Sequence, residues 1–385
     1  MNVTLYGKDK KGDIKLWTIE TGVSIGGKGI ITIHHGKEGG KQTRKDEIIY
    51  EGKQGRNAEE QAVFEANSRI KKQIDDNYRH TKEELEHLEL LAMLAVDWNK
   101  RGKSMVYPCY GSVKYDGVRA LAKKRNGVVT LESRTSQLWD VPHLISLLTI
   151  HMQEGDIWDG EIYVHGEELQ DIVSATKRTD TQAAVDKAKR KNDKLLTAES
   201  LEALREAIHI HELRPKLQFH VFDVVSEKPF VERVKDLDEL CGIPVVSPHI
   251  QITEYFYIAS EEDVKTKHQV AVGLGYEGLM LRNFQGYYES GKRSTDLQKY
   301  KTFFDSEFLI LDVLPNKDDG SAYLVRNDLN DRTFSVTLGS MTDRLEALEN
   351  KELYKQKLIT VKYQTRYKRT LLPQFPTGVA IRDYE

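Results

Sequence analysis

The stretch Lys114-Tyr115-Asp116-Gly117-Val118-Arg119 is the part of the sequence that decides the fold. It brings an amine, a carboxylate, a glycine and a guanidinium together within six positions. A run of apolar and turn-forming residues at 105–113 precedes it, and Ala120-Leu121-Ala122 follow it. This pattern predicts a strand, a tight turn at Gly117 and a second strand. In that geometry the Lys114 side chain can point into a cleft.

The composition around this stretch is that of an ordinary globular protein. The chain has 385 residues, of which 39% are hydrophobic and 30% charged, which is enough for two or three domains. Its first residues do not have the pattern of a signal peptide, and no apolar run approaches the roughly 20 residues of a membrane span. Cys109 and Cys241 stand far apart without a CxxC motif, so we expect neither a disulfide framework nor a cysteine-ligated zinc site.

The formal net charge of −3 by itself argues against a nucleic-acid partner, but the charge is unevenly distributed. Between residues 355 and 369 there is no acidic residue, and two tyrosines are interspersed with the basic ones. A stripe of this kind can follow phosphate groups. The alternative is a solvated strand face, because charge runs are usually surface. The basic residues are Lys355, Lys357, Lys362, Arg366, Lys368 and Arg369.

The first 80 residues predict a small antiparallel sheet followed by a helix. Short β-rich runs at 3–6, 15–19, 30–34 and 46–50 are separated by glycine pairs and a Gly-Asp turn. A helix is expected to open near Asn57, with Ala62, Phe64, Ala66, Ile70 and Ile74 as its apolar positions. A second helix is predicted over 82–98. A long charged helical insertion is predicted over 181–213.

The central hexapeptide, KxDGxR, resembles motif I of the covalent nucleotidyltransferases, which include DNA ligases, RNA ligases and mRNA capping enzymes. Five further stretches are similar to later motifs of that family and stand in the family's order. Their joint order is the strongest part of the resemblance, since accidents of turn, core and surface would not line up in this way. These stretches lie at residues 131–135, 156–163, 217–225, 275–282 and 297–301.

The resemblance implies a role for particular residues. Lys114 would be the nucleophile, and such an amine must lose its proton, for which we expect a site that lowers its pKa. Glu277 and Glu161 would hold Mg²⁺, because carboxylate oxygens suit this cation. ATP would be bound by Val113, Arg119, Arg134, Glu161, Phe222, Lys299 and Lys301.

Two further sets of residues follow from the resemblance. DNA-binding roles are expected for Lys177, Arg178, Lys362, Arg366, Lys368 and Arg369. The tail 373–383 resembles the family's closing motif, in which Arg382 would orient pyrophosphate. The usual lysine after the aspartate is absent, so a structural salt bridge is an equal alternative for Arg382.

The expected fold is α+β with four parts. Residues 1–80 form a β-sheet-plus-helix module, residues 81–102 a helical linker and residues 303–385 an OB-fold. Residues 103–302 form an ATP-grasp-like nucleotidyltransferase domain of antiparallel sheets flanked by helices. The first module resembles the WGR type of nucleic-acid-binding domain through Leu16-Trp17, His35-Gly36 and Gly39-Gly40, but the Trp-Gly-Arg triplet is absent. An unrelated small β-domain is the alternative.

By resemblance, the predicted function is that of an ATP-dependent DNA ligase of the phage or viral type. It would seal nicks between a 5′-phosphate and a 3′-hydroxyl in duplex DNA, during replication, repair or recombination. The expected enzyme uses ATP and Mg²⁺ as a cytoplasmic monomer of a bacterial cell or phage-infected host, with no membrane partner. An RNA ligase or capping guanylyltransferase is one alternative. A catalytically inactive nucleic-acid-binding scaffold is another.

Overall fold

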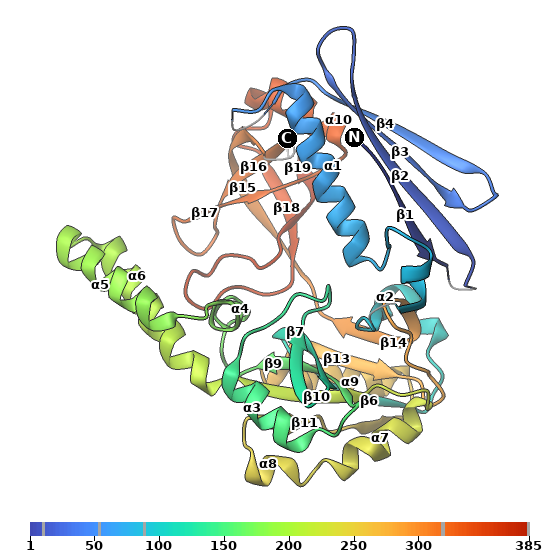
Figure 1. The fold of residues 1–385 in the computed structure, drawn as a ribbon. Helices are drawn as coiled ribbons and strands as arrows, with labels where there is room; N and C mark the ends of the chain where they lie inside the picture. Colours follow the sequence, from blue (N-terminus) through green and yellow to red (C-terminus); the bar gives the residue numbers. More distant parts are fainter. Residues whose placement is uncertain (10–11, 53–54, 88–89, 317–319, 383–385) are drawn as a thin grey trace.

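A computed structural model describes residues 1–9, 12–52, 55–87, 90–316 and 320–382. The strands of this part form four sheets, and the helices lie between and around them (Figure 1). The fold is α+β, as expected. The first sheet has the order β1-β2-β3-β4, with strands Asn2–Lys8, Ile14–Val23, Gly29–Lys37 and Gln42–Ile49.

The N-terminal sheet is the predicted antiparallel meander, and helix α1 (Ala58–Asp75) covers one of its faces. Asn57 caps α1 in a reciprocal capping box with Glu60, which satisfies two of the free N–H groups at the helix start. Most of the predicted apolar positions of α1 face the sheet. Phe64 does not: it is 50% exposed, and the Arg56 guanidinium lies 4.1 Å from its ring centroid.

The predicted helix over 82–98 is wrong, although residues 88 and 89 of it lie outside the described part. Residues Glu83–His87 form a short 3-10 helix, and Leu94–Asp97 form strand β5. Strand β5 pairs in parallel with β14, so this segment contributes an edge strand to a central sheet. Residues 90–96 are a continuous apolar run, a pattern that a buried strand shares with a helix segment.

Two five-stranded sheets form the centre of the molecule. Their orders are β11-β10-β9-β7-β8 and β12-β6-β13-β14-β5. The sheets are mixed rather than purely antiparallel, because β10–β11 and β14–β5 are parallel pairs. The remaining strands are β6 (Cys109–Lys114), β7 (Val118–Arg125), β8 (Val128–Glu132), β9 (Ile157–Tyr163), β10 (Gln218–Val224), β11 (Ile250–Ile252), β12 (Phe256–Ile258), β13 (Gly278–Arg282) and β14 (Arg293–Lys301).

Helices cover these sheets and bury two apolar cores, one beneath each sheet. Two short 3-10 turns, Gly102–Ser104 and Arg214–Lys216, directly follow helices α2 (Trp98–Arg101) and α6 (Ala198–Leu213). The helices are α2 (Trp98–Arg101), α3 (Pro142–His151), α4 (Leu169–Lys177), α5 (Thr181–Leu195), α6 (Ala198–Leu213), α7 (Phe230–Glu239), α8 (Ile243–Val246) and α9 (Glu261–Gly273).

The hexapeptide 114–119 is the crossing point between the two central sheets. Lys114 ends β6 in one sheet and Val118 begins β7 in the other, with the turn between them. A Cβ atom on Gly117 would lie 2.4 Å from the carbonyl oxygen of Ile162 in β9. Only glycine lets the turn approach β9 this closely.

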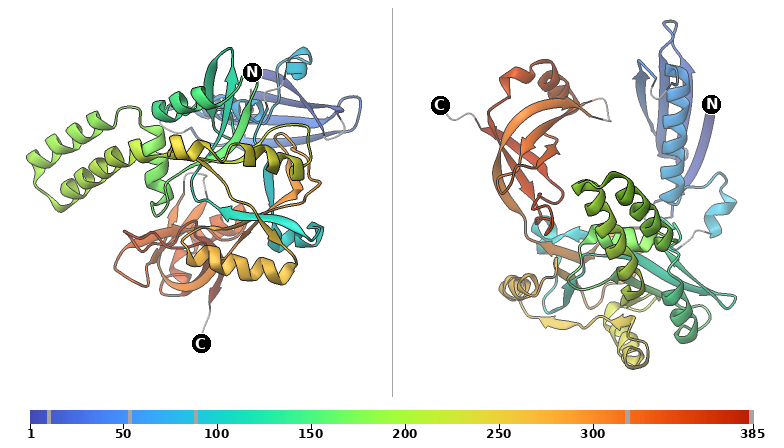
Figure 2. Two further views of the ribbon diagram at one scale, coloured as in Figure 1. Left: turned by 90° about the horizontal axis from the view of Figure 1, so that it is seen from below. Right: turned by 90° about the vertical axis from the view of Figure 1, so that its left-hand side faces the viewer.

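The predicted insertion over 181–213 is helical, but it consists of two helices. Helix α5 ends at Leu196, which has a left-handed backbone (φ 50°), and Thr197 caps the start of α6. The two helices pack against each other and project from the body of the molecule (Figures 1 and 2).

The C-terminal sheet has the order β17-β16-β15-β18-β19, with the long strand β15 shared by two antiparallel halves. Five strands with a helix between the third and fourth confirm the predicted OB-fold. Among the described residues, no helix combines the length and apolar character needed to cross a membrane. The elements are β15 (Phe304–Pro315), β16 (Ser321–Arg326), β17 (Thr333–Val336), α10 (Met341–Glu349), the 3-10 turn Lys351–Leu353, β18 (Leu358–Tyr363) and β19 (Thr377–Arg382).

Candidate active site

Three adjacent strands bring Lys114 together with Glu277 and Lys301. Lys114 ends β6, Gly278 starts β13 opposite it, and Lys301 ends β14 opposite Gly278. The backbone N–H of Glu277 donates to the carbonyl of Lys114 at 3.0 Å, which fixes the glutamate beside the lysine. The Glu277 carboxylate forms ion pairs with both the Lys114 and Lys301 amines. Two cations and one carboxylate therefore share a site in which Glu277 is only 4% exposed.

The charge state of Lys114 differs from the expectation. Burial by itself lowers the pKa of its amine, but the Glu277 and Glu161 carboxylates outweigh burial, and the pKa is raised. A lowered pKa was expected for this predicted nucleophile; in the structure the two carboxylates instead favour the protonated amine. For Glu277, Lys114 and Lys301 outweigh the effect of burial, and its pKa is lowered.

A second glutamate and a second lysine nearby have pKa values shifted in the opposite direction to those of Glu277 and Lys114. Burial raises the pKa of Glu161 to about 7, against the pull of the Lys114 and Arg119 charges. Burial also lowers the pKa of Lys299, and the positive charges of Lys301 and Lys114 lower it further. Strongly shifted groups of this kind gather at functional sites.

Lys114 lines a cavity of about 250 Å³ between the two central sheets. Predicted nucleotide-binding residues line it: Val113, Arg119, Arg134, Glu161, Phe222 and Lys299. The Phe222 ring is partly buried, and the Arg119 guanidinium lies 4.8 Å from its centroid. The cavity thus combines an aromatic face, a carboxylate and several cations, and Lys114 lies at one side of it.

Several residues lining this cavity were not predicted. Leu94 and Ala95 come from β5, the segment expected to be a helical linker. Arg282 and Arg293 also line it. Arg282 ends the family-like stretch 275–282, and Arg293 lies four residues before the stretch 297–301, so their closeness to these stretches was the available signal.

Arg119 is held by a buried carboxylate. Its Nε donates to Oδ1 of Asp159 at 2.7 Å, and the Tyr288 hydroxyl donates to Oδ2 of Asp159 at 2.7 Å. Asp159 is fully buried. Neither Asp159 nor Tyr288 was predicted as a site residue, although Asp159 lies in the family-like stretch 156–163. This pairing positions Arg119 beside Phe222.

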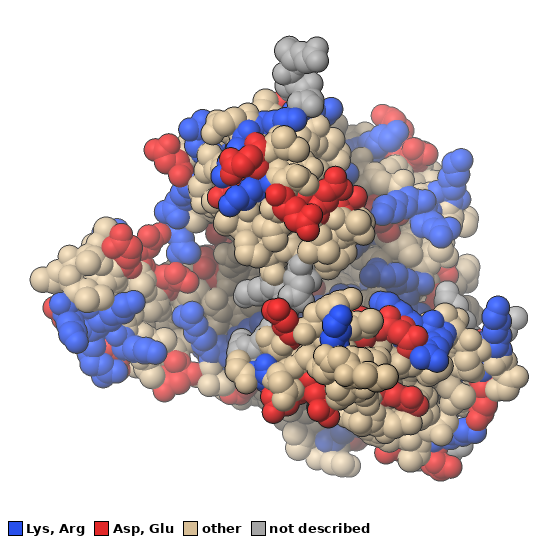
Figure 3. Space-filling model, turned by 90° about the horizontal axis from the view of Figure 1, so that it is seen from above, with Lys and Arg blue, Asp and Glu red and all other residues tan. Residues whose placement is uncertain are grey.

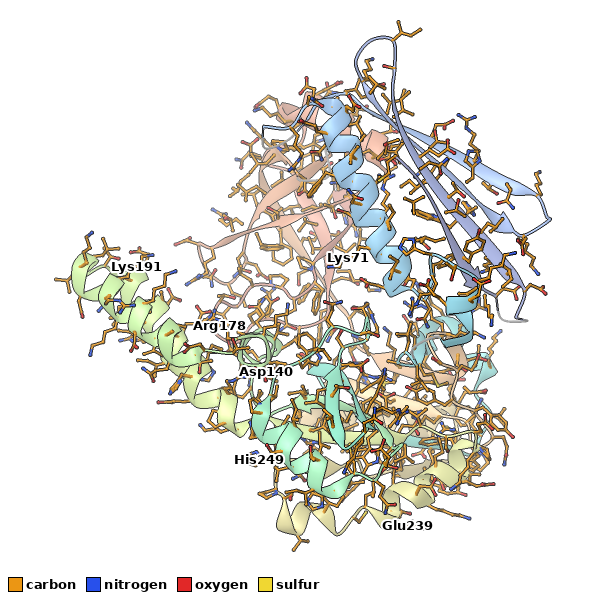
Figure 4. The ribbon with its side chains drawn as sticks, in the orientation of Figure 1. Lys71, Asp140, Arg178, Lys191, Glu239 and His249 are labelled. Atoms are coloured by element: carbon orange, nitrogen blue, oxygen red, sulfur yellow. The ribbon has the colours of Figure 1, made fainter. Side chains whose placement is uncertain are left out.

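Predicted DNA-binding residues Lys177 and Arg178 are exposed at the end of α4. Lys177 lines an open groove together with Arg119, Arg134 and Trp139, and the groove adjoins the cavity beside Lys114 because both arginines line the two. Figure 4 shows Arg178 close to the base of the α5–α6 pair, with Asp140 below it.

The C-terminal basic stripe is divided between several contacts. Arg366 pairs with Asp328 at 2.8 Å inside the OB-fold, and Lys362 is exposed over the Phe303 ring. The Lys368 amine donates to the carbonyl of Gly166 at 2.6 Å, and Arg369 lies 3.8 Å from Glu206 of α6. In this arrangement part of the stripe docks on the body of the molecule.

A glutamine missed by the sequence analysis links the OB-fold to the site. Gln364 donates to Glu277 at 2.9 Å and accepts from Lys301 at 3.0 Å. Arg382 is elsewhere, on β19, where its Nε donates to Thr360 at 2.7 Å and pairs with Glu307 at 3.3 Å. These contacts fit the salt-bridge alternative for Arg382. Asp383 of the closing motif lies outside the described residues.

Comparison with known families matches residues 90–301, more than half of the chain, to the ATP dependent DNA ligase domain. The chain belongs to the ATP-dependent DNA ligase family. The match begins at residue 90 and therefore includes β5, and it leaves the N-terminal sheet outside.

Curated relatives of this ligase family member include viral and archaeal proteins. A DNA ligase of African swine fever virus is 26% identical over 295 residues, covering 70% of this chain and 62% of the viral protein. The chain thus spans less than two thirds of the length of these viral relatives. A DNA ligase of Thermococcus fumicolans is 25% identical over 210 residues, covering 52% of this chain and 33% of that protein.

Solved structures support the same fold. A structure named Pmar-Lig_Pre is 20% identical with a TM-score of 0.60, covering 77% of this chain and 68% of its own. A structure from work on Lig E DNA ligases, described as binding DNA with a minimal scaffold, is 22% identical with a TM-score of 0.55. That likeness covers 76% of this chain and 99% of the other.

Proposed function

We propose that this protein is an ATP-dependent DNA ligase that seals nicks between a 5′-phosphate and a 3′-hydroxyl in duplex DNA. The observation that carries the proposal is the position of Lys114 at one side of the cavity, beside Glu277 and Lys301. Membership of the ligase family supports this assignment.

The proposed reaction has three phosphoryl-transfer steps. The Lys114 amine attacks the α-phosphorus of ATP, and pyrophosphate leaves as a Lys114–AMP phosphoramidate forms. The 5′-phosphate at the nick then attacks this adduct, which frees the lysine and leaves AMP on the DNA. Finally the 3′-hydroxyl attacks the activated 5′-phosphate and AMP leaves as the phosphodiester forms.

The cavity residues support specific roles in binding ATP. Phe222 offers an aromatic face for the base, and Glu161 offers a carboxylate that accepts hydrogen bonds from ribose hydroxyls. Val113, Arg119, Arg134, Lys299 and Lys301 complete the proposed nucleotide site. The cations would stabilise charge on the phosphate oxygens, and a fixed position next to Lys114 would supply much of the rate.

The donor set also suits Mg²⁺. Glu277 and Glu161 present carboxylate oxygens, the ligands that a hard divalent cation prefers, next to the nucleophile. When bound, the ion supplies positive charge to the polyphosphate. Glu277 would then be engaged away from Lys114, and the amine would lose the main partner that now keeps it protonated.

We further propose that the protein acts on nicked duplex DNA as a monomer in the cytoplasm. The proposed DNA contacts are Lys177 and Arg178 on the body and Lys362, Arg366, Lys368 and Arg369 on the OB-fold. Because Lys368 and Arg369 now contact the body, the OB-fold would have to move before they reach phosphates.

The test is the sealing of a labelled nicked duplex in the presence of Mg²⁺, with ATP or GTP as the nucleotide. DNA and RNA are placed in turn on each side of the nick. We expect sealing of the all-DNA nick with ATP. Sealing only when the strands are RNA would indicate an RNA ligase. A covalent protein–nucleotide adduct that forms with GTP and not with ATP would indicate a capping guanylyltransferase. Absence of any adduct would indicate an inactive scaffold.

A further inference from the structure

The α5–α6 pair, which we call the helical arm (residues 181–213), carries four of the five basic residues of α5 on one flank of that helix. Lys187, Arg190, Lys191 and Lys194 have the spacing i, i+3, i+4 and i+7, which places them on one flank of the helix. Asp186 and Asp193 lie four residues before and three residues after Arg190, so they border this flank on the Arg190 side. All four basic residues are exposed, and among the described residues none of them takes part in an ion pair.

The partner helix does not share this basic character. Helix α6 carries four glutamates and a single arginine, so it is acidic where α5 is basic. In a chain whose formal net charge is −3, the basic flank of α5 is a local concentration of positive charge. Such a local concentration is what a polyanion detects.

The arm is fixed firmly at its base. The Arg214 guanidinium donates to the carbonyls of Ala175 and Asp140, each at 2.6 Å. The Thr181 hydroxyl lies 3.0 Å from Nδ1 of His211, which joins the start of α5 to the end of α6. Because these contacts hold the start of α5 and the end of α6, the helical arm is a stiff extension of the central sheets and their helices.

The arm lies in line with the hollow where the proposed duplex would sit. Seen from above, the N-terminal sheet and the OB-fold stand on either side of a hollow, and the arm extends beyond one end of it (Figure 3). The side view agrees, because the arm points along the gap between these two bodies (Figure 2). Basic side chains are visible along one flank of the arm from above, and Lys191 lies toward its tip (Figures 3 and 4).

We infer that DNA bound in the hollow leaves it beside the helical arm, and that the basic flank of α5 binds the phosphate backbone of this duplex segment. The inference rests on the proposed function and adds a second DNA contact outside the nick. The basic flank runs from Lys187 to Lys194, and these seven residue steps extend about 10 Å along α5 at 1.5 Å per residue. At 3.4 Å per phosphate along a strand, this corresponds to about three base pairs of additional contact.

A matched pair of double variants tests the inference. Lys187→Gln with Lys191→Gln removes two charges from the basic flank. The control, Lys189→Gln with Lys235→Gln, removes the same charge from exposed lysines on the opposite flank of α5 and on α7. Self-adenylation with labelled ATP reports that each variant is folded and active, and we expect it to be unchanged in both.

Nick affinity is then measured at 50 and 200 mM salt with long duplex arms. Each lost phosphate contact reduces the slope of log K against log salt by about 0.9. For two contacts, the affinity gap between the wild type and the test variant should therefore shrink about twelvefold across this range. The control variant should bind like the wild type.

Trimming the DNA completes the test. When the duplex segment on the side of the helical arm is shortened so that it ends before the basic flank of α5, the wild type should lose affinity and the test variant should not. Shortening the duplex on the other side of the nick should leave the affinity difference between the two proteins intact. The inference is overturned if the test variant binds like the control, or if the affinity difference survives whichever side of the duplex is shortened. Sealing of the nick would still occur in that case, so the proposed function would stand.

Discussion

Glu277 determines the charge of the proposed nucleophile, because its carboxylate contacts both Lys114 and Lys301. The sequence predicted which residues meet here, since each stands in a stretch with family resemblance. It did not predict their protonation, which depends on burial and on the distances between charges on separate strands. The raised pKa of Lys114 is a result of that geometry.

Asp159 provides a stability test at the residue scale. It is fully buried and bonded to Arg119 and Tyr288, so Asp159→Ala would leave a guanidinium without its partner. We expect a loss of about 3–5 kcal/mol in the free energy of unfolding, measured by urea denaturation. Asp236→Ala, which breaks the more exposed pair with Lys228, should cost much less, because water screens an exposed pair. Equal losses in the two variants would contradict this account.

His220 predicts a dependence of stability on pH. Burial and, second to it, the neighbouring His165 lower its pKa to about 4; Tyr115, Tyr163 and Gln218 are its other neighbours. Between pH 6.5 and 4 the unfolded chain therefore takes up the proton more readily than the folded one. Stability should fall with acidification across this window, by up to about 3 kcal/mol.

His220→Phe is the corresponding variant, because it removes the titrating group and keeps a ring. The measurement compares the free energy of unfolding at pH 7 and at pH 4.5 for both proteins. The wild type should lose more stability than the variant. An identical loss would show that other groups cause the acid sensitivity.

At the scale of elements, the turn at Gly117 determines where Glu161 sits. A Cβ atom there would meet the Ile162 carbonyl at 2.4 Å and Cγ of Glu161 at 2.8 Å. We expect Gly117→Ala to destabilise the fold by about 1–3 kcal/mol and to reduce self-adenylation at least tenfold. Gly242→Ala is the control, since nothing lies within 4 Å of its added Cβ. Normal adduct formation by Gly117→Ala would refute the close packing.

The elements also mark where sequence patterns have limits. Alternation and turn residues predicted the N-terminal meander and the strands on either side of Gly117. Strand β5 was missed, because a short apolar run has no period that separates a buried strand from a helix. Its identity depends on pairing with β14, which is about 200 positions away in the chain. Phe64 was misplaced because an apolar residue in a helix need not face the core.

At the scale of the whole molecule, the N-terminal sheet stands opposite the OB-fold across the hollow (Figures 2 and 3). Removing residues 1–80 leaves β5 and both central sheets complete. We expect nick affinity to fall at least tenfold with a shallower salt dependence, because phosphate contacts are lost. Self-adenylation should remain. Unchanged affinity at every salt concentration would assign the module another role.

The arrangement of the bodies was the part least accessible to sequence. Motif order predicted the cavity residues, but Gln364 joins the OB-fold to Glu277 through a contact between positions 87 residues apart. The direction of the helical arm likewise depends on how α6 is anchored. Neither feature has a local pattern that would have predicted it.

Transfer of a label from ATP through the protein to DNA tests the central claim most directly. The protein is incubated with ATP labelled at the α-phosphate and Mg²⁺, the labelled peptide is mapped, and nicked duplex is then added. The account predicts a single adduct at Lys114, its disappearance as label passes to the nick, and release of AMP as the strand is sealed. Lys114→Ala should form none. An undiminished adduct in that variant, or an adduct that never passes to DNA, would contradict the account.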